Sequence, residues 1–140
     1  MAPLLLLAAL LLPGAAAAQP RPFNCVGAEQ LEDDVFEIPF APRTAAPAKA
    51  AQGNLEAAAA QARAQPERVL CVLGHAGPQE GGATTGTQLA ARRARAVAEA
   101  LATLGVERDR IRAEARVAAF ARDGTVPAER SVTVVLLPEP

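Results

Sequence analysis

This 140-residue sequence contains no tryptophan and no tyrosine, and its only aromatic residues are four phenylalanines. Proteins that bind glycans or single-stranded nucleic acids usually stack several aromatic rings on their ligands, so both classes lose support. Net charge is also nearly absent, because 14 basic residues are balanced by 15 acidic ones. No excess of positive charge draws the chain toward nucleic acid or anionic lipid, and we expect no nucleic-acid partner.

Histidine and cysteine are scarce as well. The chain has one histidine, His75, and two cysteines. Metal sites usually combine several such side chains at close spacing, and this pattern is missing, so we expect neither a metal nor another cofactor. Catalysis by His75 would need a nucleophile or a carboxylate partner, and no motif supplies one. The glycine-rich stretch 81–86 lacks the Gly-Lys-Ser/Thr of a phosphate-binding loop, and we predict that the protein is not an enzyme.

The first eighteen residues are typical of a secretory signal peptide. Leu4–Leu12 is an unbroken apolar run, and a Pro-Gly pair and the small residues Ala15–Ala18 follow it. The run is shorter than the roughly twenty residues of a membrane span, so we expect cleavage after Ala18 and no transmembrane span in the mature chain. The alternative is a buried apolar helix of a cytosolic domain. Removing 18 of the 140 residues leaves 122, enough for one domain.

The two cysteines, Cys25 and Cys71, would meet an oxidising compartment in an exported chain. A disulfide between them would tie the N-terminal segment of the mature chain to the second predicted strand. In the chain-entropy model, closing this loop of about 46 residues contributes about 3 to 4 kcal/mol. Sequence does not fix the distance between the two positions, so a buried free Cys71 is the alternative to the disulfide that we predict.

Strands and helices alternate along the rest of the chain. Apolar patterns predict strands at 36–40, 69–73, 111–117 and 131–137, and helices at 47–65 and 87–104. Pro39 places the first strand at a sheet edge, where its missing N–H is tolerated, and Gly105 ends the second helix. This order predicts an α/β (α+β) sandwich, in which a mixed sheet packs against helices.

One residue of the second helix conflicts with its surroundings. On a helical wheel of about 100° per residue, Arg93 falls on the apolar face between Leu89 and Val97. Arg92 and Arg95 fall on the opposite face, where we expect Arg95 to pair with Glu99. A guanidinium directed toward a core is costly unless an anion or several acceptors meet it. The partner of Arg93 is either the carboxylate of a ligand, or an internal carboxylate or backbone carbonyls at the end of the second strand.

Two neighbouring motifs resemble a known family. Gly74-His75-Ala76-Gly77 ends the second strand, and Leu89-Ala90-Ala91-Arg92-Arg93-Ala94-Arg95-Ala96-Val97 follows it in the helix. Together they resemble the OmpA-like domain, a peptidoglycan-binding module that reads Gly-His-Thr/Ala-Asp and then Leu-Ser-x-x-Arg-Ala-x-Ala-Val. Three further segments match the family's later markers: Leu104-Gly105-Val106, Asp109-Arg110-Ile111 and Glu129-Arg130-Ser131-Val132.

The resemblance implies an exported cell-envelope protein with a βαβαβ-β domain. It would have a signal peptide at 1–18, an N-terminal extension at 19–34 and the OmpA-like domain at 35–137. In the family, the arginine matching Arg93 grips a carboxylate of diaminopimelate in the peptidoglycan stem peptide, and the motif's aspartate receives the ammonium group. That aspartate is Gly77 here. The resemblance therefore implies non-covalent but weakened binding of diaminopimelate-type peptidoglycan.

The candidate ligand-binding residues are Arg93, His75, Gly77, Glu80 and Arg130. Among them, Glu80 lies in the loop after the motif and is the residue that could replace the missing aspartate. The alternative function is a degenerate OmpA-like domain that acts as an envelope structural or protein-interaction module without peptidoglycan binding. In either case we expect a periplasmic protein, free or associated with the outer membrane, with other envelope proteins as candidate partners.

Overall fold

The computed structural model describes residues 21–77, 80, 85–116 and 130–139. The predicted signal peptide at 1–18 lies outside these residues. In chain order the elements are η1 (Ala28–Gln30), β1 (Val35–Pro39), η2 (Lys49–Ala51), α1 (Gln52–Ala64), β2 (Leu70–Gly74), α2 (Gly86–Thr103), η3 (Arg108–Arg110), β3 (Ile111–Ala115) and β4 (Ser131–Leu136). The predicted order of strands and helices is confirmed, and most boundaries differ from the prediction by one or two residues.

The first helix begins later than predicted. We expected it to start at Pro47, but that residue pairs with Phe40 in an isolated antiparallel bridge. The chain then passes through the single 3-10 turn of η2 before α1 starts at Gln52. Pro47 therefore belongs to the segment that connects β1 to the helix, and this segment contributes to the site described below.

The strands form one mixed sheet in the order β1-β4-β2-β3. β4 runs antiparallel to both β1 and β2, whereas β2 and β3 are parallel. Every residue of the two central strands is buried. β1 lies at an edge of the sheet, as Pro39 predicted. An edge strand tolerates proline because the missing N–H removes no hydrogen bond of the sheet interior. The mixed-sheet prediction is confirmed.

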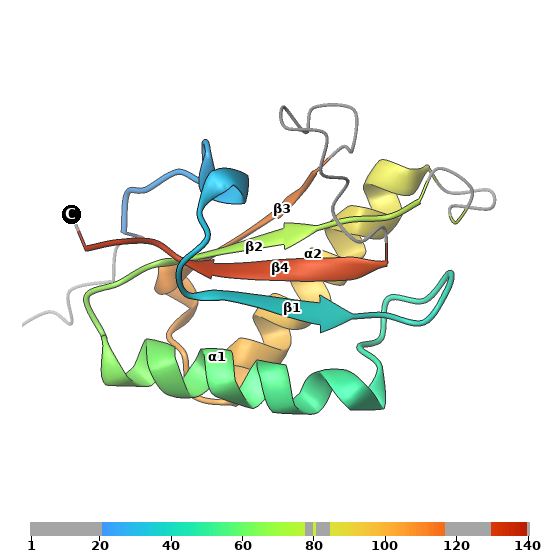
Figure 1. Ribbon diagram of the computed structural model, residues 1–140. Coiled ribbons are helices and arrows are strands. Elements are labelled where there is room, and N and C mark those ends of the chain that lie inside the picture. Colours follow the sequence, from blue (N-terminus) through green and yellow to red (C-terminus); the bar gives the residue numbers. More distant parts are fainter. Residues whose placement is uncertain (1–20, 78–79, 81–84, 117–129, 140) are drawn as a thin grey trace, which may run out of the picture.

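Both α-helices cover the same face of the sheet (Figure 1). The core between the layers combines aliphatic residues of β2, β4 and α2 with the small alanines of α1: Leu70, Val72, Val132, Val134, Val97, Leu101, Ala58, Ala59 and Ala62. Fully burying one aliphatic side chain stabilises a fold by about 1.5 to 3 kcal/mol. Alanines on α1 let that helix lie close to the strands.

Gly74 lies where the end of β2 meets α2. A Cβ atom at this position would lie 1.9 Å from the carbonyl oxygen of Ala90 and 3.1 Å from the Cβ atom of Ala94. Because no side chain fits there, glycine is required for the strand to run directly against the helix. This contact fixes the end of β2 beside the helical turn that carries Arg93.

The N-terminal segment covers the opposite face of the sheet. Cys25 and Ala28 pack there with Cys71, Leu73 and Val135. A disulfide joins Cys25 to Cys71, whose Cα atoms are 5.7 Å apart, so the structure contains the predicted bridge. We call residues 23–31 the N-terminal cover.

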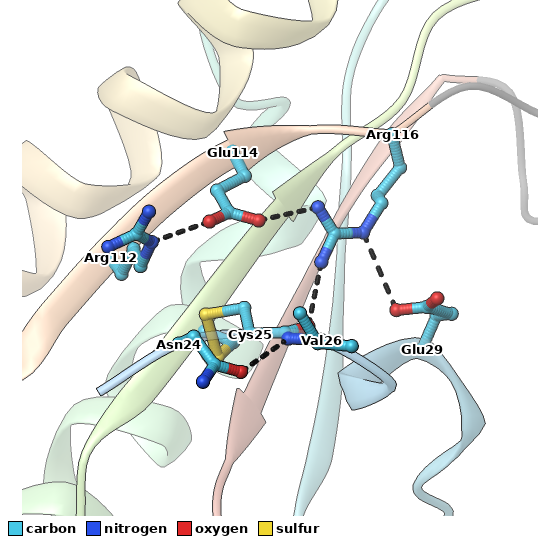
Figure 2. Close-up of a disulfide and its surroundings, with 8 residues drawn as sticks. Asn24, Cys25, Val26, Glu29, Arg112, Glu114 and Arg116 are labelled. Carbon is cyan, nitrogen blue, oxygen red and sulfur yellow. Dashed lines mark hydrogen bonds and ion pairs between the residues drawn. A yellow bond between two sulfur atoms is a disulfide. The ribbon is translucent and has the colours of Figure 1, made fainter.

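Arg116 holds the N-terminal cover by charge and hydrogen bonds (Figure 2). Its Nη2 donates to the carbonyl oxygen of Cys25 at 2.8 Å, and its Nε lies 3.4 Å from the Glu29 carboxylate. Its Nη1 pairs with Glu114 of β3 at 2.6 Å. The cover is thus linked to β2 covalently and to the end of β3 by polar contacts.

Candidate functional site

Arg93 has no exposed surface. It lies on the buried face of α2 together with Leu89 and Val97, whereas Arg92 and Arg95 are exposed. The placement predicted from the helical wheel is therefore confirmed. A guanidinium that is removed from water needs acceptors within the protein, because an unpaired buried charge is strongly destabilising.

Five hydrogen bonds join the Arg93 guanidinium to residues within the described ranges. Its Nε donates to the carbonyl oxygen of Thr44 at 2.8 Å. Nη1 donates to the carbonyl oxygen of His75 at 3.0 Å and to Oε1 of Glu80 at 3.1 Å. Nη2 donates to the carbonyl oxygen of Ala41 at 3.3 Å and to Oε2 of Glu80 at 2.6 Å. A guanidinium carries five N–H donors, so these contacts use its full capacity.

The acceptors come from three segments that meet at one end of the sheet. Ala41 and Thr44 follow β1, His75 follows β2, and Glu80 lies in the loop before α2. The ring of Phe40 also lies against the guanidinium, with Cζ of Arg93 5.4 Å from the ring centroid. This distance is within the range of a cation–π contact. Arg93 therefore joins the ends of two strands to the second turn of α2.

Glu80 supplies the negative charge at this site. Besides the two bonds from Arg93, its carboxylate accepts the backbone N–H of Gly77 at 2.8 Å and that of Arg43 at 3.0 Å. The hydrogen bonds from Arg93 are the main reason that the pKa of Glu80 falls from 4.5 to about 2, while burial acts in the opposite direction. The Glu80 carboxyl is therefore ionised at neutral pH, and it forms an ion pair with Arg93.

Of the alternatives that the sequence left open for Arg93, the structure contains the internal one. The guanidinium meets the internal carboxylate of Glu80 and backbone carbonyls, including that of His75 at the end of β2. Gly77 contributes its backbone N–H and not a side chain. Glu80 does reach the site, but both of its oxygens are directed at Arg93.

The His75 side chain lies on the other face of the sheet. Its Nε2 is 3.1 Å from Oγ1 of Thr133, and that hydroxyl donates to Oε1 of Glu37 at 2.9 Å. Burial and, to a lesser degree, the charge of Arg116 lower the pKa of His75 from 6.5 to about 4. The imidazole is therefore neutral at neutral pH, and only the backbone carbonyl of His75 belongs to the Arg93 site.

Arg130, the remaining candidate, is exposed. Its carbonyl oxygen accepts the N–H of Phe40 at 2.8 Å, so its backbone lies next to the residue that stacks on Arg93. Sequence reasoning missed Ala41 and Thr44 as partners of Arg93. They contribute only carbonyl oxygens, and any residue type can offer a carbonyl, so no sequence signal could have found them.

In the part of the chain that the structure describes, two other arginines are almost fully buried, at the opposite end of β2. Arg110 donates to the carbonyl oxygens of Arg68, Ala62 and Gln65. Arg68 itself donates to the carbonyl oxygens of Leu136 and Leu137 and pairs with Asp34. These contacts connect the end of α1 to the strands, and we interpret both arginines as structural.

At the Arg93 site the guanidinium binds a carboxylate of the chain itself, that of Glu80. Within the described ranges, no cluster of three or more His, Cys, Asp and Glu side chains is placed to hold a metal ion. In the same part of the chain, no helix has the length and apolar character needed to cross a membrane. What the site offers is a guanidinium with two parallel donors, supported by the backbone N–H groups of Gly77 and Arg43.

Comparisons with known proteins agree on the fold. The model of the OmpA family matches residues 40–132. A search of curated proteins found no match. Among solved structures, the OmpA-like domain of FopA1 from Francisella tularensis subsp. tularensis SCHU S4 has a TM-score of 0.59 and 18% identity, over 79% of this chain and 80% of that one.

Two further structures are similar to a comparable degree. The peptidoglycan-associated lipoprotein from Burkholderia pseudomallei has a TM-score of 0.56 and 20% identity, over 73% of this chain and 88% of that one. The periplasmic domain of Helicobacter pylori MotB has a TM-score of 0.61 and 17% identity, over 76% of this chain and 74% of that one. At these identities the similarity shows a common fold.

Proposed function

Because this chain belongs to the OmpA family, we propose that it is a cell-envelope protein that binds peptidoglycan non-covalently. In this proposal Arg93 holds a carboxylate of the diaminopimelate-type stem peptide at the end of β2. The names of two similar structures support the location and the ligand class, since one is a peptidoglycan-associated lipoprotein and the other a periplasmic domain.

The bidentate contact between Arg93 and Glu80 carries the proposal. Two guanidinium nitrogens bind the two oxygens of one carboxylate, at 3.1 Å and 2.6 Å. Such paired bonds fix the orientation of a carboxylate as well as adding binding energy. The nearby N-terminus of α2 adds a favourable potential for an anion. This geometry supports a carboxylate-binding role for the end of β2.

We further propose that the chain is exported by a signal peptide at 1–18. The mature protein would consist of an N-terminal extension at 19–34 and the domain at 35–137, in the periplasm. The match to the OmpA family at 40–132 lies inside this proposed domain. Other envelope proteins remain candidate partners.

We propose weakened binding because Gly77 has no carboxylate for the ammonium group of the ligand. A charge-assisted hydrogen bond contributes about 1.5 to 3 kcal/mol, so its absence weakens binding by about tenfold to a hundredfold. The carboxylate of Glu80 is engaged by Arg93 and is not directed to a separate position for that ammonium group.

Co-sedimentation with purified diaminopimelate-type sacculi tests the proposal. We expect the mature protein to pellet with sacculi, and the double variant Arg93→Met/Glu80→Gln to stay in the supernatant. The double variant removes the guanidinium without leaving a buried carboxylate unpaired, which favours a folded protein. Arg92→Ala, an exposed change on the same helix, is the matched control and should pellet like the wild type.

Failure of the wild type to pellet, or equal pelleting of the double variant, would contradict the proposed role of Arg93.

One observation favours the alternative function, an envelope structural or protein-interaction module without peptidoglycan binding. All five donors of Arg93 already have acceptors within the chain. Under that alternative, neither protein would pellet.

A further inference from the structure

We infer that Glu80 is an internal ligand of the carboxylate site, which occupies the Arg93 guanidinium in the free protein and competes with the carboxylate of an incoming ligand. This inference rests on the proposed function and adds to it a means of regulating the same site. This role differs from replacing the missing aspartate. Glu80 would compete with the ligand's carboxylate for Arg93, whereas a replacement for the aspartate would bind the ligand's ammonium group.

The partners of Arg93 differ in whether they can be exchanged. Ala41, Thr44 and His75 contribute backbone carbonyls, which cannot leave without moving the chain beside β1 and β2. Glu80 contributes a side-chain carboxylate, which rotation about its own bonds can withdraw. Among these contacts, the one made by Glu80 is therefore the exchangeable one. It is also the one that a ligand carboxylate could reproduce.

The Glu80 carboxylate lies in a site with four converging donors. Nη1 and Nη2 of Arg93 bind its two oxygens, and the N–H groups of Gly77 and Arg43 add one bond to each oxygen. Arg43 has a φ of 60°, in the left-handed region that non-glycine residues seldom adopt. A carboxylate that replaced Glu80 would meet the same four donors.

Glu80 is the partly exposed member of the buried ion pair. The Arg93 side chain has no exposed surface, while 12% of the Glu80 side chain is exposed beside it. The Glu80 N–H donates to the carbonyl oxygen of Gly77 at 3.2 Å, which anchors its backbone next to the site. A carboxylate tethered this close has an effective concentration in the millimolar range or above, so a free ligand must outcompete it.

Carboxylate rescue of Glu80→Ala tests the inference. The variant leaves the Arg93 guanidinium without its counter-charge, so we expect a lower melting temperature. Addition of acetate or meso-diaminopimelate at about 50 mM should raise the melting temperature of the variant, and not that of the wild type, because an anion that binds only the folded state stabilises it. Chloride at equal ionic strength separates a site-specific effect from screening.

Sacculi binding gives the second measurement. Glu80→Gln keeps the size of the side chain and one oxygen acceptor but removes the charge, so it should fold even where Glu80→Ala does not. We expect it to bind sacculi about tenfold more tightly than the wild type. Glu99→Ala is the matched control, because Glu99 pairs with Arg108 in an exposed contact far from the site, and it should change neither result.

The outcomes separate this inference from the proposed function. If the wild type pellets through Arg93 but Glu80→Gln binds no more tightly and carboxylates do not rescue Glu80→Ala, Glu80 is a structural partner and the inference is wrong. If carboxylates rescue Glu80→Ala while no protein pellets with sacculi, Glu80 is an internal ligand and peptidoglycan is the wrong ligand for the site.

Discussion

Arg93 and Arg116 lie on opposite faces of the sheet near the end of β2, and their surroundings differ. On the helical face, Arg93 is wholly buried and all its donors meet internal acceptors. On the other face, 23% of the Arg116 side chain is exposed, and the cover that it holds is also attached by a disulfide. The fold should therefore depend strongly on Arg93 and weakly on Arg116, because the carboxylate that pairs with Arg93 is 12% exposed, whereas the two that pair with Arg116 are 26% and 42% exposed.

The largest expected effect follows from replacing each arginine by alanine. Arg93→Ala leaves the Glu80 carboxylate without its counter-charge and removes the donor that the Thr44 and His75 carbonyls share, so we expect a loss of about 3 to 5 kcal/mol in the free energy of unfolding. Arg116→Ala removes contacts that solvent can replace, and should cost no more than about 1 kcal/mol. Urea denaturation measures both values, and similar losses would break the contrast between the two faces.

Removal of the disulfide should separate stability from binding. Cys25→Ala/Cys71→Ala frees a loop with a sequence separation of 46 residues. In the chain-entropy model, we expect a loss of about 3 to 4 kcal/mol. Binding to sacculi should remain unchanged below the melting temperature of the variant, since the cover and Arg93 lie on opposite faces. A parallel loss of sacculi binding in the folded variant would show that the faces are coupled.

The smallest expected effect is a difference in pH dependence. Because the pKa of His75 is about 4 in the fold and about 6.5 when unfolded, the unfolded state takes up the proton first as pH falls. This contribution is full above pH 6.5 and is lost toward pH 4, with a slope of at most about 1.4 kcal/mol per pH unit. Glu80 acts in a lower window, because its pKa of about 2 keeps its contribution present above pH 4.5 and loses it toward pH 2.

Urea denaturation of His75→Gln at pH 7, 5 and 3 measures this difference. The groups around the imidazole are Thr133, Arg116 and Glu29, with Glu37 reached through Thr133. We expect the variant to lose less stability than the wild type between pH 7 and 5. An unchanged slope in that interval would place the acid sensitivity of the fold elsewhere.

The sequence predicted the fold and the position of Arg93 because both leave local signals. Apolar periodicity placed the strands and helices, and it placed Arg93 on the apolar face of its helix, where the structure has it. The need for glycine at position 74 became visible only in three dimensions, because α2 passes within contact distance of its backbone. The OmpA family, identified from the motifs around Gly74 and Arg93, is confirmed by the match over residues 40–132.

The partners of Arg93 could not be predicted in the same way. Ala41 and Thr44 act through carbonyl oxygens, and the contact of Glu80 depends on the conformation of a loop that has no periodic pattern. The expected pair of Arg95 with Glu99 was wrong for a related reason. Glu99 pairs with Arg108, because the turn after α2 brings this residue back along the helix. Local spacing predicts faces of helices, whereas ion pairs also depend on segments that return from elsewhere.

The disulfide has a mechanical consequence. Tension applied to the chain before Cys25 cannot peel the cover from the sheet, because the load passes through the sulfur atoms to Cys71, the second residue of β2. The same strand ends at Gly74, and the carbonyl of His75, the next residue, accepts a hydrogen bond from Arg93. Force applied at the N-terminal side and resisted at the carboxylate site would thus act along β2. This strand is hydrogen-bonded to β4 on one side and to β3 on the other, and it would bear the load in shear.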